Sequence, residues 1–388
     1  MLESISLLEP LMPPVGHKKL EDLASEIIAA AEGLNQSVHP IVRQELGKLV
    51  RSMNCYYSNL IEGHRTLPTD IEKALNNDFV NDVRTKNLQL EAIAHIKVQE
   101  KIDLDLAPGT VVSEERICWL HQEFASHLPG SMLNVENKEG TKVVEIIPGH
   151  YRDGNVIVGK HIAISAPAIS SFLARFKQGY DPVKLSTVNA VIAAAASHHR
   201  LLWIHPFYDG NGRVSRLFSH GYLKEIGIGN SLWSIARGLS RNIDDYKKFL
   251  ALADSPRWND LDGRGNLTTR GLIEFCDFFL NICLDQIRFM SSLIEPNKIL
   301  NRMEIYVEEQ VRLGNLLPNS FLLLKQLWLE GEIAKNRVPQ IVGYKERQAR
   351  NLQNKLIESG LVVADAIRSP LRLNFPIEVA ERYFPSLF

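Results

Sequence analysis

The chain has 388 residues, of which 45% are hydrophobic, and its 44 lysine and arginine residues nearly balance 45 aspartate and glutamate residues, for a formal net charge of -1. A chain of this length typically folds into about two or three domains, and the composition excludes a disordered or fibrous protein. The balanced charge argues against a uniformly basic nucleic-acid-binding protein, but it does not exclude a local basic patch.

Apolar runs and cysteines narrow the class of protein further. The richest apolar run, residues 188–196, is far shorter than the ~20 residues that cross a membrane, so we expect no membrane span and no membrane partner. Residues 1–4 lack the cationic segment of a secretory signal. No cysteines form a Cys-x-x-Cys pair, and Cys276 and Cys283 lie in an apolar, helix-like segment. Buried free thiols and a cytoplasmic location are therefore expected.

The hydrophobic periodicity predicts a mainly α-helical fold. Apolar residues at helical spacing predict a long helix over 41–61, which Gly63 ends. Residues 142–159 differ, because β-branched residues flank Pro-Gly and Asp-Gly-Asn turns there and predict a small β-hairpin. Other helices up to residue 223 are expected at 20–31, 68–76, 80–101, 113–127, 166–178, 184–200 and 214–223.

The C-terminal part has a different pattern. Helices are expected at 319–330, 334–342 and 345–359, and short strands at 361–363 and 371–373. Helix, turn, helix and a two-stranded wing is the order of a winged helix-turn-helix module. Between residues 335 and 355 the only acid is Glu346, and Arg347 and Arg350 share a helix face. This cluster suits DNA binding, with recruitment of a target protein or dimerisation as the alternatives.

A run of twelve residues, 205–216, carries the most informative chemistry: His-Pro-Phe-Tyr-Asp-Gly-Asn-Gly-Arg-Val-Ser-Arg. Gly210 and Gly212 allow the backbone to approach a ligand closely. The run leads into a helix, whose N-terminus favours phosphate groups. Arg213 and Arg216 are three residues apart, so they share a helix face and can hold successive phosphates.

Two further side chains of this run suit catalysis. Asp209 is an oxygen ligand of the kind that holds Mg²⁺ on a polyphosphate. A neutral His205 can accept the proton of an attacking hydroxyl group. A metal site formed by His198, His199 and His205 is the alternative, but neighbouring histidines point apart on a helix. Each residue alone is more often structural, so the prediction depends on their combination.

The run resembles the signature of the Fic (filamentation induced by cAMP) family, HxFx(D/E)GNGRxxR, at every position. The resemblance implies the mostly helical Fic fold and transfer of AMP from ATP, with Mg²⁺, to a hydroxyl side chain of a protein. It also implies that Phe207 packs inward and anchors the loop. The implied site comprises His205 as the catalytic base, Asp209 as the Mg²⁺ ligand, and Asp209, Gly210, Asn211, Gly212, Arg213 and Arg216 as ATP-binding residues.

Two other segments are similar to parts of the same family. Residues 149–161 resemble the flap that aligns the target segment by strand addition. Residues 244–254 resemble the helix that lines the nucleotide pocket. The candidate nucleotide-site residues in these segments are Val158, Gly159, Lys160, His161, Tyr246 and Asp254.

A third segment matches the family's inhibitory pattern, (S/T)xxxE(G/N), at Ser58 to Gly63. Ser58 and Glu62 are four residues apart and share a helix face. By resemblance, Glu62 pairs with Arg216 and occupies the cation that the γ-phosphate needs. The alternative is an ordinary solvated glutamate at a helix end.

We therefore expect an N-terminal helical region over 1–110 with an inhibitory helix at about 41–62, a Fic catalytic core over 111–298 and a winged helix-turn-helix over 299–388. The expected function is autoinhibited AMP transfer (AMPylation) to a Ser, Thr or Tyr hydroxyl of a target protein or of the chain itself, with a homodimer left open. The alternatives are another phosphoryl or nucleotidyl transfer, removal of AMP, or a DNA-binding regulator that senses nucleotide.

Overall fold

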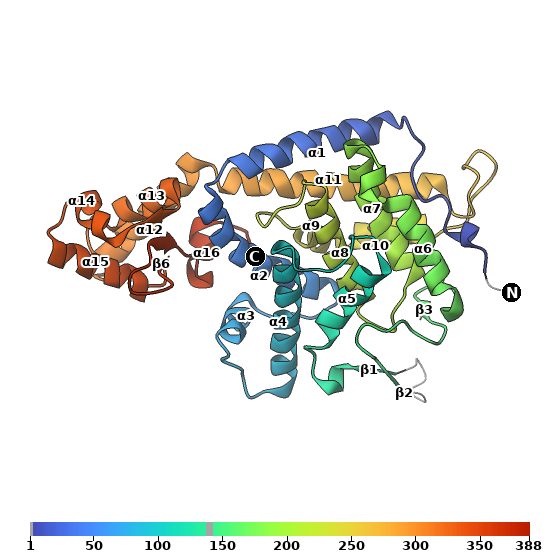
Figure 1. The fold of residues 1–388 in the computed structure, drawn as a ribbon, viewed down its shortest axis with the longest axis horizontal. Coiled ribbons are helices and arrows are strands. Elements are labelled where there is room, and N and C mark those ends of the chain that lie inside the picture. Colours follow the sequence, from blue (N-terminus) through green and yellow to red (C-terminus); the bar gives the residue numbers. More distant parts are fainter. Residues whose placement is uncertain (1–2, 137–142) are drawn as a thin grey trace. The chain divides into compact units, whose positions relative to one another are not determined.

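The computed structural model describes residues 3–136 and 143–388 of the chain (Figure 1). Lys142, the first residue of the predicted hairpin stretch, lies outside the described residues. Two compact units are present: unit 1 comprises Met1–Ala31, Asn54–Asn230 and Ser234–Gln286, and unit 2 comprises Glu32–Met53, Ser231–Trp233 and Ile287–Phe388. The three regions expected in chain order stay a prediction.

The expected mainly helical fold is confirmed. Helices α1 (Lys18–Gln36), α2 (Pro40–Ile61) and α11 (Thr269–Leu293) contribute residues to both units. The other helices of unit 1 are α3 (Pro68–Leu75), α4 (Val83–Asp103), α5 (Glu114–Ala125), α6 (Ile169–Tyr180), α7 (Thr187–Ile204), α8 (Asn211–Glu225), α9 (Ile235–Arg241) and α10 (Ile243–Ala253). The other helices of unit 2 are α12 (Pro296–Arg312), α13 (Ser320–Glu330), α14 (Val338–Val342), α15 (Glu346–Glu358) and α16 (Ile377–Tyr383). Among the described residues, no helix is both long enough and apolar enough to cross a membrane.

Helix α7 forms the centre of unit 1 because it is apolar on every side. All residues from Ala190 to Leu201 are buried, and the helix packs against both α6 and α8 (Figure 1). Its polar end is buried as well, since the ring nitrogens of His198 lie 2.7 Å from the Ser219 hydroxyl and 2.7 Å from the Tyr246 hydroxyl. The segment that follows α7 is thereby held by a rigid core helix.

Two small antiparallel hairpins belong to unit 1. Strand β1 (Asn134–Glu136) pairs with β2 (Val143–Glu145), and β3 (Ile157–Val158) pairs with β4 (His161–Ile162). The single hairpin expected over 142–159 is not formed, because residues 143–145 pair with β1 and residues 157–158 pair with β4. Between them lies a turn at Pro148 and Gly149, where Gly149 has a φ of 80°, followed by an irregular segment to Arg152. The Arg152 side chain is buried, and it ties this turn to backbone carbonyl groups.

The C-terminal part of unit 2 has the predicted order of elements with one strand added. Helix α13 packs against α12 and α14, and α14 packs against α15. Strands β5 (Glu332–Ile333), β6 (Val362–Val363) and β7 (Leu371–Leu373) form an antiparallel sheet in the order β5-β7-β6. The first of these, β5, was not expected from the sequence. The assignment of this part as a winged helix stays a prediction.

Other elements were also missed from the sequence, namely α9, α12 and α16. Helix α12 does have a regular apolar period, with Ile299, Met303 and Val307 buried at four-residue spacing, so its signal was present in the sequence. Helices α9 and α16 have only seven residues each, too few for a clear period. The thiol prediction is confirmed, because all four cysteines are free and both Cys276 and Cys283 are buried.

Candidate functional site

The candidate site is the loop between α7 and α8, whose shape follows from its own sequence. His205 ends α7 in the left-handed region at a φ of 51°, which is unusual for a residue with a Cβ atom. Gly210 precedes α8 at a φ of 78°, where glycine carries no steric penalty. The Asn211 side chain closes the loop by accepting a hydrogen bond from the Phe207 amide (3.0 Å) and donating one to its carbonyl (2.8 Å). The loop is therefore held rigidly.

The N-terminus of α8 has no side-chain cap. The first amide groups of a helix lack partners within the helix, and together with the helix dipole they favour an anion. Arg213 and Arg216 lie in the first two turns of the same helix. This end of α8 has the chemistry of a phosphate-binding site.

His205 is held in a neutral form that can accept a proton. Burial lowers its pKa to about 4. Its Nδ1 lies 3.3 Å from the Leu202 carbonyl oxygen. A hydrogen on Nδ1 directed at that carbonyl leaves the lone pair on Nε2. The Arg152 guanidinium donates a 2.8 Å hydrogen bond to the His205 carbonyl and so fixes its backbone.

Phe207 packs inward, as the resemblance implied, and is fully buried. The His121 ring, from α5, stacks on it with centroids 3.9 Å apart and planes 4° from parallel. Nδ1 of His121 accepts a hydrogen bond from the Gly149 amide at 2.9 Å. Burial lowers the pKa of His121 to about 4, so this ring is neutral and accepts that hydrogen bond. The loop thus rests on an aromatic pair fixed by the Gly149 turn.

Arg216 makes the ion pair that the inhibitory pattern implied. Its Nη2 lies 2.6 Å from Oε1 of Glu62, and its Nε donates a 2.8 Å hydrogen bond to the Ser58 hydroxyl. The Arg216 side chain is 3% exposed and that of Glu62 is 30% exposed, so the glutamate is the partner that can move into solvent. Gly212 permits this approach, because a Cβ atom there would overlap Oε1 of Glu62.

The charge state of this pair follows from its surroundings. Burial raises the pKa of Glu62, but the positive charges of Arg216 and Arg213 outweigh it, and the net pKa lies below the ordinary value of 4.5. A carboxylate with a lowered pKa stabilises the fold above its unfolded pKa and loses that contribution as the pH falls through its folded pKa. The ion pair therefore persists throughout the neutral range.

Arg213 has a second, more deeply buried partner. It forms an ion pair with Glu91 on α4, and both side chains are nearly inaccessible, at 6% and 1% exposed. Nδ1 of His64 lies 2.7 Å from Oε2 of Glu91 and 3.0 Å from an amino group of Arg213. Because neither side chain reaches solvent, this pair braces Arg213 rather than exchanging with water.

Tyr246 and Asp254, predicted beside the nucleoside, lie against α7. The Tyr246 side chain is buried with its hydroxyl on His198. Oδ1 of Asp254 lies 3.1 Å from Nε2 of His199. His198 and His199 thus have separate partners, and no group of three or more His, Cys, Asp or Glu side chains within residues 3–136 and 143–388 is arranged to hold a metal ion.

The predicted flap is the β3–β4 hairpin, with Gly159 and Lys160 at its turn. The His161 ring lies 2.7 Å from the Trp203 carbonyl oxygen and tethers the hairpin to α7. Ile157 and Val158 on β3 are 57% and 43% exposed. The hairpin therefore presents apolar residues to the solvent.

Asp209 is exposed at the rim of the loop. Mg²⁺ in nucleotide sites commonly takes one or two carboxylates and completes its shell with phosphate oxygens and water. A single accessible carboxylate beside a phosphate-binding helix end fits that ligand set. Asp209 is the residue of the loop that would hold the ion.

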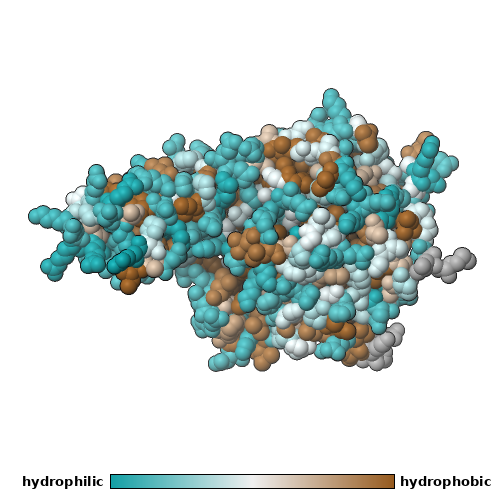
Figure 2. Space-filling view, viewed as in Figure 1, coloured by the Kyte–Doolittle hydropathy of each residue, from teal (hydrophilic) through white to brown (hydrophobic). Residues whose placement is uncertain are grey.

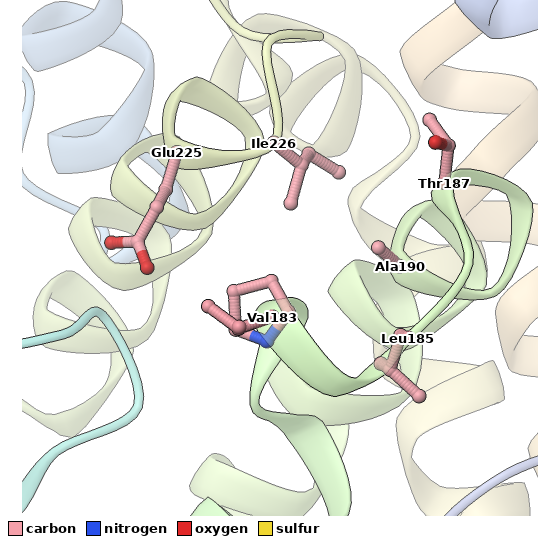
Figure 3. Close-up of a pocket in the computed structure, with 7 residues that line it drawn as sticks. Val183, Leu185, Thr187, Ala190, Glu225 and Ile226 are labelled. Atoms are coloured by element: carbon pink, nitrogen blue, oxygen red, sulfur yellow. The ribbon is translucent and has the colours of Figure 1, made fainter.

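Unit 1 also has a pocket of about 260 Å³, which is separate from the candidate site (Figure 3). Its lining is largely apolar, with Val183, Leu185 and Ile226, and the Glu225 carboxylate stands at one side. None of its lining residues belongs to the loop or to the segment around Glu62.

Glu91, His64, Arg152 and His121 were missed by sequence reasoning. One signal was available for Glu91. With His95 and Gln99 it forms a polar stripe at four-residue spacing along α4, and all three are buried. A polar stripe on a helix is more often a solvated face, so the pattern alone does not identify a buried one.

Comparison with known proteins agrees with the loop and the fold. Residues 111–223 match the model of the Fic/DOC family. The Protein adenylyltransferase Fic of Drosophila erecta and that of Drosophila melanogaster are each 27% identical to this chain over 172 residues, which cover 44% of this chain and 32% of each relative. The chain thus matches about a third of the length of these curated relatives.

Solved structures share the fold. A Fic family protein from Desulfovibrio desulfuricans G20 aligns with a TM-score of 0.55 at 17% identity, covering 94% of this chain and 98% of that one. Fic-1 from C. elegans aligns with a TM-score of 0.52 at 14% identity, covering 71% and 73%. At such identities the likeness concerns the fold alone. The match to the Fic/DOC family model concerns residues 111–223, which contain the loop and most of α8.

Removal of the buried Glu91 charge tests the brace on Arg213. Glu91→Gln leaves the buried guanidinium without a counter-charge, so the free energy of unfolding should fall by about 3 kcal/mol. Glu274→Gln is the matched control, because its pair with Arg270 is exposed and its loss should cost less than about 1 kcal/mol. Urea titration at neutral pH measures both changes. Equal changes in the two variants would contradict the brace.

The titration of His64 tests the same cluster independently. The hydrogen bond and negative charge of Glu91 raise the pKa of His64, against the lowering effects of burial and Arg213. We expect NMR of ¹³C-histidine-labelled protein to find a pKa above 6.5 for His64, and Glu91→Gln to bring it down. Protonated His64 contributes fully to the stability of the fold at a pH below its unfolded pKa. This contribution is lost as the pH rises through the raised pKa of the folded state. A pKa that Glu91→Gln leaves unchanged would refute this coupling.

Proposed function

We propose that this chain is an autoinhibited protein adenylyltransferase, which transfers AMP from ATP to a hydroxyl side chain of a target protein. The observation that carries the proposal is the juxtaposition in one rigid loop of a neutral His205 and the uncapped N-terminus of α8. The relatives named Protein adenylyltransferase Fic support the same reaction.

The proposed reaction is a displacement at the α-phosphorus. The hydroxyl oxygen of the target bonds to that phosphorus, and its proton passes to Nε2 of His205. The bond from the α-phosphorus to the oxygen that bridges to the β-phosphorus breaks, and pyrophosphate leaves with the electron pair. The amide groups at the start of α8, with Arg216 once Glu62 has moved, would hold the phosphates through charge-assisted hydrogen bonds, and the buried Arg213 would add its positive charge to the ATP-binding site. Mg²⁺ held by Asp209 would neutralise negative charge on the leaving pyrophosphate.

The target segment is proposed to lie along the β3–β4 hairpin. Its exposed residues Ile157, Val158 and Ile162 offer an apolar edge that pairs with no third strand among residues 3–136 and 143–388. An extended segment that adds to such an edge is held mainly by backbone hydrogen bonds, so targets of different sequence can present their hydroxyl groups.

Glu62 is proposed to restrain the reaction by competing with the γ-phosphate. It occupies the amino group of Arg216 that a terminal phosphate would use, at 2.6 Å. A carboxylate and a phosphate bind a guanidinium through the same fork of donors, so the two exclude each other. Since the Glu62 side chain is the more exposed partner, displacement needs a movement of Glu62 and not of α8.

Isotopic labelling tests the reaction and the restraint together. With [α-³²P]ATP and Mg²⁺, Glu62→Gly should label protein at least about tenfold more than the unmodified sequence, because one charge-assisted contact is removed. Glu62→Gly combined with His205→Ala should give no label. Label from [γ-³²P]ATP instead would indicate phosphate transfer. An unlabelled Glu62→Gly variant would contradict AMP transfer and leave a nucleotide-sensing regulator.

The pH dependence tests the role of His205. A pKa of about 4 keeps the imidazole neutral in mild acid. In the Glu62→Gly variant at saturating ATP, the rate of AMP transfer should therefore change less than about twofold between about pH 8 and pH 5, whereas a base with the ordinary pKa would lose about 30-fold at pH 5. A rate of AMP transfer that falls on the acid side with a midpoint near pH 6.5 would contradict the lowered pKa of His205.

A further inference from the structure

Helix α15 has one buried face and one exposed polar face. Ala349, Leu352 and Leu356 are buried against the rest of unit 2, at i, i+3 and i+7 spacing. Arg347 and Arg350 lie on the opposite side and are exposed. Hydrophilic side chains dominate the surface over α14 and α15 (Figure 2). The exposed face is thus separated from the core by the helix itself.

The positive charges near α15 divide into engaged and unengaged groups. Arg337 pairs with Glu330 at 2.6 Å. Lys335 donates a 2.8 Å hydrogen bond to the Ile367 carbonyl at the β6–β7 turn, and Lys355 donates a 3.0 Å hydrogen bond to the Gly314 carbonyl. These three side chains therefore already have partners within unit 2.

The remaining three cations, Lys345, Arg347 and Arg350, lie on the first two turns of α15 or directly before them. Their side chains make no hydrogen bond or ion pair with any residue that the structure describes. In contrast, Arg372 at the sheet of the same unit pairs with Asp365 at 2.6 Å. An exposed arginine with no carboxylate partner keeps its full donor capacity for an external anion.

These cations line a depression of about 610 Å³ together with amide side chains and without any carboxylate. Gln348, Asn351 and Asn354 supply the amides, all exposed. Amide side chains can donate and accept hydrogen bonds at base edges, whereas arginine and lysine bind phosphates and guanine. The surface therefore has both kinds of donor that a nucleic acid requires.

We propose that this face of α15, lined by Lys345, Arg347, Gln348, Arg350, Asn351 and Asn354, is a docking surface for duplex DNA. A single exposed helix with its N-terminal residues forward fits the major groove of B-form DNA, which is wide enough to admit a helix. The major groove of duplex RNA is too narrow to admit a helix. An acidic peptide would pair with the cations but would leave the three amides without a matching pattern. The proposal is independent of the AMP-transfer reaction.

Fluorescence anisotropy with the full chain and a labelled DNA duplex of about 20 base pairs tests the proposal. The logarithm of the association constant should fall against the logarithm of salt concentration with a slope of about -3, from three phosphate contacts. Arg347→Gln combined with Arg350→Gln should weaken binding at least about tenfold at low salt and make the slope shallower by about 2. The same sequence as duplex RNA should bind more weakly than the DNA.

The matched control removes two paired positive charges from the same unit, Lys298→Gln with Arg312→Gln, whose partners are Glu295 and Glu308. It has the same net charge as the α15 variant, and its DNA binding should equal that of the unmodified chain. No DNA binding at low salt would overturn the proposal. So would equal losses in the two double variants, or a poly-glutamate peptide that binds as tightly as DNA and with the same dependence on Arg347 and Arg350.

Discussion

Two guanidinium groups lie at the buried start of α8, and the rest of the candidate site is arranged around neutralising them. Burial of a charge is costly without a partner, and each group has a carboxylate from a helix far away in the sequence. Arg213 meets Glu91 of α4, and Arg216 meets Glu62 at the end of α2. The two pairs differ in the exposure of the carboxylate, so we propose that the first is a permanent brace and that the second can exchange with a phosphate.

The same distinction lets a rigid loop carry the restraint that we propose for Glu62. Its shape depends on contacts that a ligand does not disturb: the Asn211 closure, the Phe207–His121 stack and the Arg152 hydrogen bonds to backbone carbonyls. His205 and the first amides of α8, which we propose to face the nucleotide, are thereby positioned by contacts within the fold. Release of the proposed restraint then needs only the movement of Glu62, whose side chain is 30% exposed, and no rearrangement of α8.

Residues 205–216 could be predicted as a site because their functional groups are adjacent in the chain. Helices such as 41–61 could be predicted because their apolar period is regular. Glu91 and His64 could not, since their role depends on tertiary contacts that bring α4 and the turn after α2 to α8. The two-residue strand β5 was missed because so short a segment has no period. The hairpin predicted over 142–159 was wrong because the Pro-Gly turn at Gly149 resembles a hairpin turn.

The proposed restraint depends on competition between Glu62 and the terminal phosphate of ATP for Arg216. The most direct measurement is the equilibrium affinity for Mg–ATP by isothermal titration calorimetry, with His205→Ala present in both proteins so that no transfer occurs. Replacing Glu62 by glutamine removes the charge and keeps the shape of the side chain. We expect this variant to bind Mg–ATP about 10- to 100-fold more tightly, corresponding to one charge-assisted hydrogen bond. Equal affinities would contradict it.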